Sequence, residues 1–251
     1  MTDNHTNPCY VIFGATGGIG SALSRILAGS GAKLVLAARD TDRLNALASE
    51  LGSTACPTDA TQFDAVETCI GKAIQTHGRI NGIANCVGSL LLKPAHSTSE
   101  TEWHATIAAN LTSAFAVVRA GTKAMTQGGN AGGSIVLVSS AAARIGLANH
   151  EAIAAAKAGV IGLTLSAAAT YAPRGVRINC VAPGLVRTPM SKRLTDNDAS
   201  LKVSTTMHAL GRIGEPDDVA RSLQWLLDPE QSWVTGQVLG VDGGLGTLRS
   251  R

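Results

Sequence analysis

The chain has 251 residues, a length that fits one large α/β domain better than two small domains. Hydrophobic residues make up 45% of it and charged residues 16%, a balance that excludes a disordered protein. The net charge of +3 comes without the basic block that marks a nucleic-acid or anionic-membrane surface. The five cysteines are widely spaced, and neither they nor the histidines have metal-site spacing. We therefore expect no metal and a reducing, cytoplasmic compartment.

Short apolar runs alternate with amphipathic segments along the chain. The runs predict buried strands at 10–13, 33–37, 55–57, 80–85, 134–138, 176–181 and 237–241. Helical spacing predicts helices at 19–28, 41–51, 64–76, 101–126 (one long helix or two joined pieces), 152–171 and 217–227. This alternation is typical of a parallel sheet covered on both faces. The sequence thus predicts an α/β fold, a three-layer doubly wound parallel sheet, as a single domain over residues 9–251 after a flexible N-terminus, residues 1–8.

Two stretches need separate interpretation. Residues 152–169 are the least polar part of the chain, but they contain Lys157 and many small residues. We expect a buried or interface helix there and not a membrane span. Residues 188–211 are polar and irregular, and we interpret them as a mobile segment over the active-site side.

A glycine-rich turn lies between the first strand and the first helix. Its sequence is Gly14-Ala15-Thr16-Gly17-Gly18-Ile19-Gly20, and the glycines let the backbone turn sharply and approach a diphosphate. The helix behind the turn offers free N–H groups and positive partial charge. The turn therefore predicts a Rossmann-type dinucleotide site formed by Gly14, Thr16, Gly17, Gly18, Ile19 and Gly20.

The tip of the second strand indicates which dinucleotide binds. A carboxylate there would bond the ribose 2′-hydroxyl of NAD and repel a 2′-phosphate. The tip reads Ala37-Ala38-Arg39-Asp40, and the guanidinium of Arg39 can pair with a 2′-phosphate. We therefore favour NADP(H) over NAD(H). In the alternative interpretation Arg39 is a solvated surface charge, and Asp40 caps the next helix in either case.

Further motifs follow in a fixed order over nearly the whole chain. They include Asn85-Cys86-Val87-Gly88 after the fourth strand, Lys157 within a small-residue helix, and Val241-Asp242-Gly243-Gly244 near the end. With the glycine turn, they resemble the short-chain dehydrogenase/reductase family. The resemblance implies that Ser140 bonds the substrate oxygen, that Asn110 supports a proton path and that Lys157 holds the nicotinamide ribose. The cofactor-binding residues that it adds are Asp59, Ala60, Asn85, Gly88, Lys157, Pro183, Gly184, Val186 and Thr188.

The resemblance breaks at the family's proton donor. That donor is a tyrosine four residues before the lysine, on the same face of one helix, and this chain has Ile153 there. Ser140 lies thirteen residues before Ile153, a spacing common in the family, so the register holds. Tyr171 lies about four turns beyond Lys157 and cannot reach the site.

Three interpretations of the missing tyrosine stay open. In the first, His150 transfers the proton, because it shares a helix face with Ile153 and Lys157 and because imidazole exchanges protons near neutral pH. The enoyl reductase branch of the family has its tyrosine at that position, seven residues before the lysine. In the second, the reacting bond is an activated alkene or imine that needs no strong side-chain acid. In the third, the domain binds the cofactor without turnover.

The sequence thus predicts an NADP(H)-dependent oxidoreductase that moves a hydride to or from a small carbonyl, alcohol or activated double bond. The alternative is a cofactor-binding pseudoenzyme that works as a structural or regulatory subunit. The resemblance also implies a homodimer or homotetramer. We expect a small-molecule substrate, with neither nucleic acid nor membrane as a partner. The other histidines, His208 among them, we interpret as surface or substrate-segment residues.

Overall fold

The computed structural model describes residues 7–127 and 131–248. The strands are β1 (Cys9–Phe13), β2 (Lys33–Ala38), β3 (Thr54–Pro57), β4 (Gly82–Asn85), β5 (Gly133–Val138), β6 (Val176–Pro183) and β7 (Val238–Val241). They form a seven-stranded sheet in the order β3-β2-β1-β4-β5-β6-β7, and every neighbouring pair is parallel. The prediction of a doubly wound parallel sheet in a single domain is confirmed.

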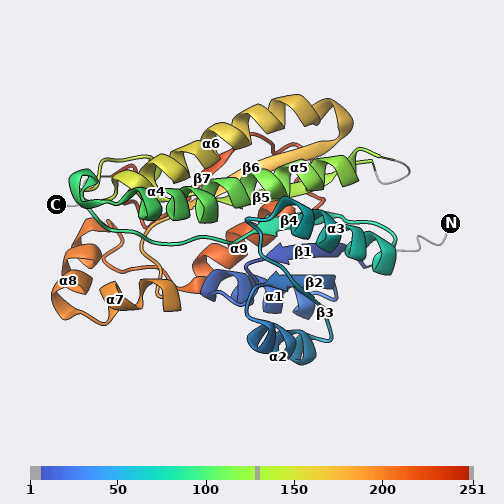
Figure 1. Ribbon diagram of the computed structural model, residues 1–251, viewed down its shortest axis with the longest axis horizontal. Helices are drawn as coiled ribbons and strands as arrows, with labels where there is room; N and C mark the ends of the chain where they lie inside the picture. The colour runs from blue at the N-terminus through green and yellow to red at the C-terminus, as the bar shows by residue number, and fades with distance from the viewer. Residues whose placement is uncertain (1–6, 128–130, 249–251) are drawn as a thin grey trace.

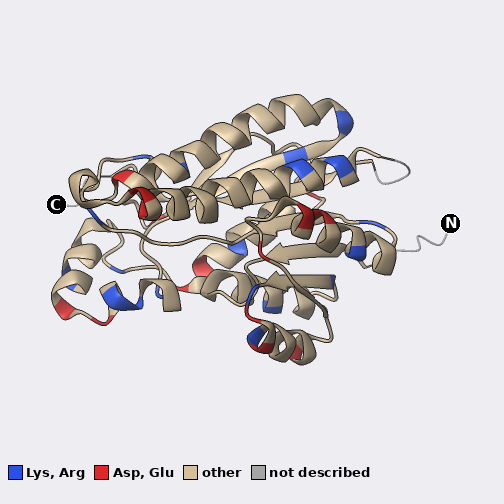
Figure 2. Cartoon of the chain, in the orientation of Figure 1, with Lys and Arg blue, Asp and Glu red and all other residues tan. Residues whose placement is uncertain are grey.

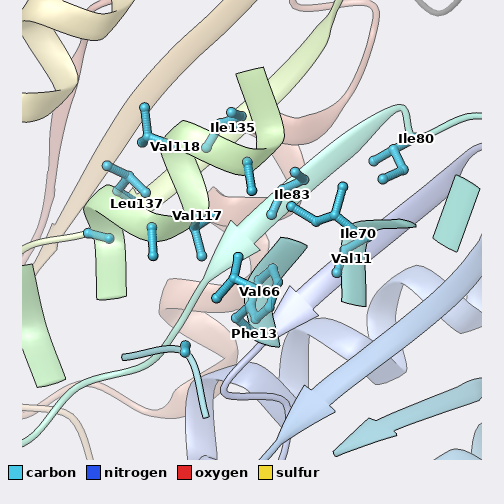
Figure 3. Packing of buried hydrophobic residues seen from close by; sticks show 14 of the residues in the cluster. Val11, Phe13, Val66, Ile70, Ile80, Ile83, Val117, Val118, Ile135 and Leu137 are labelled. Atoms are coloured by element: carbon cyan, nitrogen blue, oxygen red, sulfur yellow. The ribbon is translucent and has the colours of Figure 1, made fainter. Parts of the chain in front are cut away.

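Helices cover both faces of the sheet (Figure 1). On one face lie α1 (Gly18–Gly29), α2 (Thr41–Leu51) and α9 (Pro216–Leu227); on the other lie α3 (Phe63–His77), α4 (Glu100–Ile107), α5 (Ser113–Met125) and α6 (Glu151–Tyr171). Side chains alternate along each strand, because successive residues of a strand point to opposite faces. In β1, Tyr10 and Ile12 join the core beneath α1 and α9, whereas Val11 and Phe13 join the core beneath α3 and α5 (Figure 3).

Charged residues are confined mainly to helices and loops (Figure 2). The central strands β1, β4 and β5 contain none, which is expected of parallel strands buried on both sides. The centre of the sheet is therefore apolar, and the charged side chains lie mainly outside it, in the helices and in the loops at the ends of the strands.

Helix α6 belongs to the core of the domain. With the turn that continues it to Arg174, it is the one described segment long and apolar enough to cross a membrane by length and composition. Its residues Ala156, Val160 and Ala167 are buried, and Val160 and Ala167 belong to the core cluster that faces β5 and β6. A core helix of this kind passes the same composition test, in agreement with the prediction of a buried helix.

The segment predicted as one long helix or two pieces is two helices. A π-helical turn, Ala108–Thr112, joins α4 to α5. The prediction that residues 188–211 are irregular was wrong, because α7 (Lys192–Thr195) and α8 (Asp198–Met207) lie there. The signal was a helix cap: the side chain of Asn197 accepts a hydrogen bond from Ser200 N at 2.9 Å.

The predicted flexible N-terminus, residues 1–8, falls mostly outside the described residues, which begin at residue 7. The carbonyl oxygen of Pro8 accepts a hydrogen bond from Lys33 N at 2.9 Å. Pairing with β2 therefore begins one residue before β1.

Candidate active site

The site is built where the strands end. Phe13 pairs with both Ala37 and Asn85, and Asn85 pairs with Leu137, so the carboxyl ends of β2, β1, β4 and β5 are level. The strand order reverses beside β1, where β2 lies on one side and β4 on the other. Ligands of doubly wound sheets bind at such a switch point. The loops that follow these strands carry the predicted site residues.

The glycine turn after β1 is a backbone cradle. Gly14 has a φ of 74°, which favours glycine, and a Cβ there would lie 2.8 Å from the backbone of Cys86. A Cβ on Gly20 would overlap the carbonyl oxygen of Gly14. Helix α1 begins at Gly18 without a side-chain cap and without an acidic residue in its first turn. Its open N–H groups and positive end fit a dinucleotide diphosphate.

A cleft of about 960 Å³ lies beside this cradle. It brings together seven of the predicted cofactor residues: Gly14, Thr16, Gly17, Arg39, Asp59, Ala60 and Gly88. Hydrogen bonds from Thr61 lower the pKa of Asp59, so its carboxylate is charged at neutral pH. The predicted cap is present too, since the side chain of Asp40 accepts from Arg43 N at 3.1 Å.

Arg43 is a cleft residue that the sequence reasoning missed. Its Nη2 donates to the carbonyl oxygen of Thr16 at 2.8 Å, and it lines the cleft together with Arg39. The available signal was its place in the first turn of α2, right after the strand tip that carries Arg39. The cleft therefore has two guanidinium groups at the end where β2 stops.

Other predicted cofactor residues lie around the cleft and do not line it. Asn85 is buried, and its Oδ1 accepts from Val87 N at 3.2 Å, which shapes the loop after β4. Ile19 packs against the core beneath α1. Val186 is buried and bridges to Gly214. Thr188 lies on the glycine turn, because a Cβ on Gly18 would be 2.7 Å from its Cγ2.

Lys157 and Asn110 meet at Gly88. A Cβ on Gly88 would lie 2.9 Å from Asn110 Oδ1 and 3.5 Å from Lys157 Nζ, so a side chain at this position would crowd the Asn110 amide. The Nζ of Lys157 donates to the carbonyl oxygen of Val138 at 2.8 Å. Burial lowers the pKa of Lys157 to about 8. Asn110 lies in the π-helical turn, and its Oδ1 accepts from Ser89 N at 3.2 Å.

A second cavity, of about 380 Å³, adjoins the cleft at Leu90, which lines both. Predicted residues Ser140, His150, Pro183 and Gly184 line it, and so does Ile153. Its apolar lining comes mainly from Leu90, Leu92, Leu147, Leu185, Leu194, Met207 and Leu245. Of the predicted catalytic residues, the structure thus brings Ser140 and His150 into one apolar cavity beside the dinucleotide cleft, whereas Asn110 and Lys157 do not line that cavity.

His150 lies at the N-cap of α6, ahead of the first helical residue. Its Nδ1 is 2.7 Å from the carbonyl oxygen of Ala148. A carbonyl oxygen only accepts, so Nδ1 carries a hydrogen and Nε2 is the nitrogen that can gain or lose a proton. The neighbouring Glu151 points elsewhere, since its carboxylate accepts from Ala95 N at 3.4 Å.

Comparison with known proteins assigns the chain to a protein family. Residues 14–246 match a protein-family model described as enoyl-(acyl carrier protein) reductase. The chain is 35% identical over 244 residues to 3-oxoacyl-(acyl-carrier-protein) reductase FabG of Thermotoga maritima, covering 94% of this chain and 96% of that protein. The chain belongs to the short-chain dehydrogenase/reductase family. It is therefore an oxidoreductase of the short-chain type with a pyridine-nucleotide site.

Other members of the family are similar to this chain in sequence and in structure. A 2,5-dichloro-2,5-cyclohexadiene-1,4-diol dehydrogenase of Sphingobium indicum is 34% identical over 239 residues, which cover 93% of this chain and 95% of that one. A short-chain type dehydrogenase/reductase from Mycobacterium ulcerans superposes with a TM-score of 0.92 at 30% identity, covering 98% and 92% of the two chains. A variant of actinorhodin polyketide ketoreductase with NADPH has a TM-score of 0.90 at 25% identity, covering 96% and 98%.

Proposed function

We propose that this short-chain dehydrogenase/reductase is an NADP(H)-dependent oxidoreductase that acts on a small, neutral carbonyl or alcohol, or on an activated double bond. His150 moves the proton in place of a tyrosine. The observation that carries this proposal is the cavity in which Ser140, His150 and Ile153 lie together, next to the dinucleotide cleft. A nicotinamide bound across the two spaces supplies or accepts the hydride.

The cofactor assignment rests on the charges at the end of β2. Arg39 and Arg43 line the cleft, and guanidinium groups match a 2′-phosphate through charge-assisted hydrogen bonds. The NADPH in the related polyketide ketoreductase supports the same choice. The glycine cradle holds the diphosphate, Asp59 and Ala60 flank the adenosine half, and Lys157 with the segment from Pro183 to Thr188 holds the nicotinamide half.

The proton step depends on His150 because Ile153 has no exchangeable proton. The carbonyl oxygen of Ala148 fixes the imidazole ring through Nδ1. Nε2 then gives its proton to a carbonyl substrate during reduction and takes it back during alcohol oxidation. Ser140 bonds the substrate oxygen. Lys157 and Asn110 both lie at Gly88 in the loop after β4, and Asn110 Nδ2 donates to Ser89 Oγ at 2.9 Å.

The cavity lining indicates the polarity of the substrate. Among the described residues that line it, none is Asp, Glu, Lys or Arg, and the histidines are His150 and His208. Burying a carboxylate or phosphate there without a partner would be costly. We therefore propose a neutral substrate whose carbon skeleton contacts the leucines and Met207.

Ile153 favours a second candidate function, a cofactor-binding pseudoenzyme that works as a structural or regulatory subunit. It occupies the helix position of the family's proton donor and is buried, at 3% exposure. In this case the cleft binds NADP(H) and the cavity turns over no substrate.

We propose that the protein associates with further copies of itself, as a homodimer or homotetramer. We also propose that it works in the cytoplasm. Phe115 on α5 and Leu165 on α6 are about half exposed, at 47% and 50%, and large apolar groups on neighbouring helices favour self-association. The cysteines, all within the described residues, are free, which supports a reducing compartment. Light scattering of the purified protein tests the oligomeric state.

To test the proposed function, the rate of NADPH oxidation is measured with a panel of neutral ketones and activated alkenes. Wild type, His150→Ala and Ile153→Tyr are compared, each after cofactor binding has been measured by calorimetry. We expect turnover by the wild type and a loss of about 10²-fold or more in His150→Ala. Turnover by Ile153→Tyr alone supports the pseudoenzyme. Equal rates for His150→Ala and wild type exclude His150 as the donor.

A further inference from the structure

His208 is the C-cap of helix α8 and is more deeply buried than any residue of the helix. The residues Asp198–Met207 are partly buried or exposed, whereas His208 is only 3% exposed. A helix without fully buried side chains gains less stability from packing than one with a buried face. The attachment of α8 to the rest of the domain therefore depends strongly on this one side chain.

Both ring nitrogens of His208 bond to backbone atoms of different segments. Nδ1 lies 2.6 Å from the carbonyl oxygen of Ser204, in α8. Nε2 accepts a 3.1 Å hydrogen bond from Leu185 N, which follows β6. The carbonyl only accepts and the amide only donates, so the ring is neutral, with its hydrogen on Nδ1. The imidazole thus links α8 to the loop after β6.

Two glycines make the space for this ring. A Cβ on Gly184 would lie 2.5 Å from His208 Nε2, and a Cβ on Gly243 would lie 3.4 Å from His208 Cδ2. These glycines follow β6 and β7, so the ring is inserted between two strand ends. Any larger residue at position 184 would displace it.

The residues joined by this ring line the apolar cavity from two different segments of the chain. Ser204 and Met207 line it from α8, and Leu185 lines it from the loop after β6. The ring lines the cavity too, but the backbone already uses both of its nitrogens. It is thus available to hold the walls and not to bond a substrate.

We propose that His208 is a positioning residue that couples the α8 wall to Leu185 and thereby sets the shape of the substrate cavity. The coupling itself is a property of the free protein. Only its consequence for substrate affinity rests on the proposed function. A matched pair of substitutions separates the hydrogen bond from the bulk of the ring: His208→Leu removes the acceptor for Leu185 N, whereas His208→Gln can supply an amide oxygen near the position of Nε2.

Hydrogen exchange of the cofactor-free protein tests the coupling without any activity. In His208→Leu we expect amides in residues 198–207 and at Leu185 to exchange about tenfold faster, with β5 amides unchanged. His208→Gln should restore rates close to the wild type. His104→Leu is the control, because the His104 side chain is 67% exposed on α4, and it should change neither region. Wild-type exchange in His208→Leu overturns the proposal, and so does fast exchange of these amides in a folded His208→Gln.

If the β5 amides of His208→Leu also exchange fast, that variant has unfolded. The His208→Gln variant then provides the test by itself. Wild-type exchange in His208→Gln then supports the coupling, and selective loss at residues 185 and 198–207 overturns it.

Once a substrate has been found, steady-state kinetics of the His208 variants provide a second test of the proposal. We expect His208→Leu to raise KM about tenfold while kcat stays within about twofold. A lower kcat at unchanged KM contradicts a role in shaping the cavity. If no substrate turns over, the proposed function fails, and the exchange result still stands on its own.

Discussion

The ammonium group of Lys157 donates a 2.8 Å hydrogen bond to the carbonyl oxygen of Val138, the last residue of β5. The contact is reciprocated one residue later, since Ser139 Oγ donates to the carbonyl oxygen of Lys157 at 2.8 Å. Ser140 is the next residue. The lysine on the cofactor side and the serine on the substrate side are therefore held to the same strand end, and these two hydrogen bonds fix the lysine against the residues just before Ser140.

Lys157 makes this contact at a cost that depends on pH. Burial lowers its pKa from the ordinary 10.5 to about 8, so its charged form destabilises the cofactor-free fold by about 3 kcal/mol at pH 7. Lys157→Met removes this cost but loses a hydrogen bond worth about 1 kcal/mol. We expect the variant to be about 2 kcal/mol more stable than the wild type at pH 7, as measured by urea unfolding.

The sign of the pH effect follows from the lowered pKa. Between about pH 8 and pH 10.5 the unfolded chain binds more protons at this position than the folded chain. Wild-type stability therefore rises relative to Lys157→Met across that window. A difference in unfolding free energy that stays constant from pH 7 to pH 10 would contradict the buried ammonium.

Two glycines of α1 provide a test of the cradle. Gly20→Ala places a methyl group against the carbonyl oxygen of Gly14, whereas a Cβ on Gly29 meets nothing within 4 Å. We expect Gly20→Ala to lose about 1–3 kcal/mol of stability and to weaken NADPH binding at least tenfold. Gly29→Ala, in the same helix, should gain up to about 1 kcal/mol and bind NADPH normally. Calorimetric titration and thermal unfolding measure both effects, and equal behaviour of the two variants would be evidence against the cradle.

The arginines at the end of β2 should govern the choice of cofactor. Removing a guanidinium that pairs with a 2′-phosphate costs charge-assisted hydrogen bonds, about 1.5–3 kcal/mol when they are well formed. We expect Arg39→Ala and Arg43→Ala each to raise the Kd for NADPH about tenfold and to leave the Kd for NADH within about twofold. Fluorescence titration of both cofactors provides the comparison. Wild-type protein that binds NADH more tightly than NADPH would refute the assignment of NADP(H).

Substrate polarity is testable with compounds of similar size. The cavity offers leucine and methionine side chains, so a neutral cyclic ketone such as cyclohexanone loses little on burial, whereas a 2-oxo acid must bury its carboxylate. We expect kcat/KM for the ketone to exceed that for the acid by about 10²-fold or more, measured by NADPH oxidation at one pH. Comparable values for the two would place a cationic group in the site.

Much of this fold follows from local patterns. Continuous apolar runs such as Tyr10–Phe13 and the glycine turn that follows predict both the parallel sheet and the place of the phosphate cradle, because each pattern is set by neighbouring residues. Ser140 and His150 also fall in one cavity with Ile153. His150, however, is the N-cap of α6 and not a residue on its helical face, and Lys157 does not line that cavity.

Features that depend on distant partners escaped prediction. Arg43 belongs to the cleft only because α2 turns it back toward Thr16. His208 is buried by glycines that are 24 and 35 residues away in the chain. The helices α7 and α8 were hidden because a polar, weakly periodic sequence carries no burial pattern. The cap at Asn197 marks the start of α8, whereas Thr188 caps only the short 3-10 turn Pro189–Ser191 that precedes α7.

The direction of the strands gives the two termini different surroundings. The described chain enters β1 at the side of the sheet opposite the catalytic loops, and its first and last described residues lie toward opposite sides of the molecule (Figure 1). Near the other end, Leu245 already lines the apolar cavity, and Leu248 lies beside a neighbouring hollow that contains His208. An affinity tag or fluorescent fusion attached at the start of the chain therefore leaves the reaction space clear. Because Leu248, the last described residue, lies close to this space, we expect the same addition after the other end of the chain to disturb substrate entry.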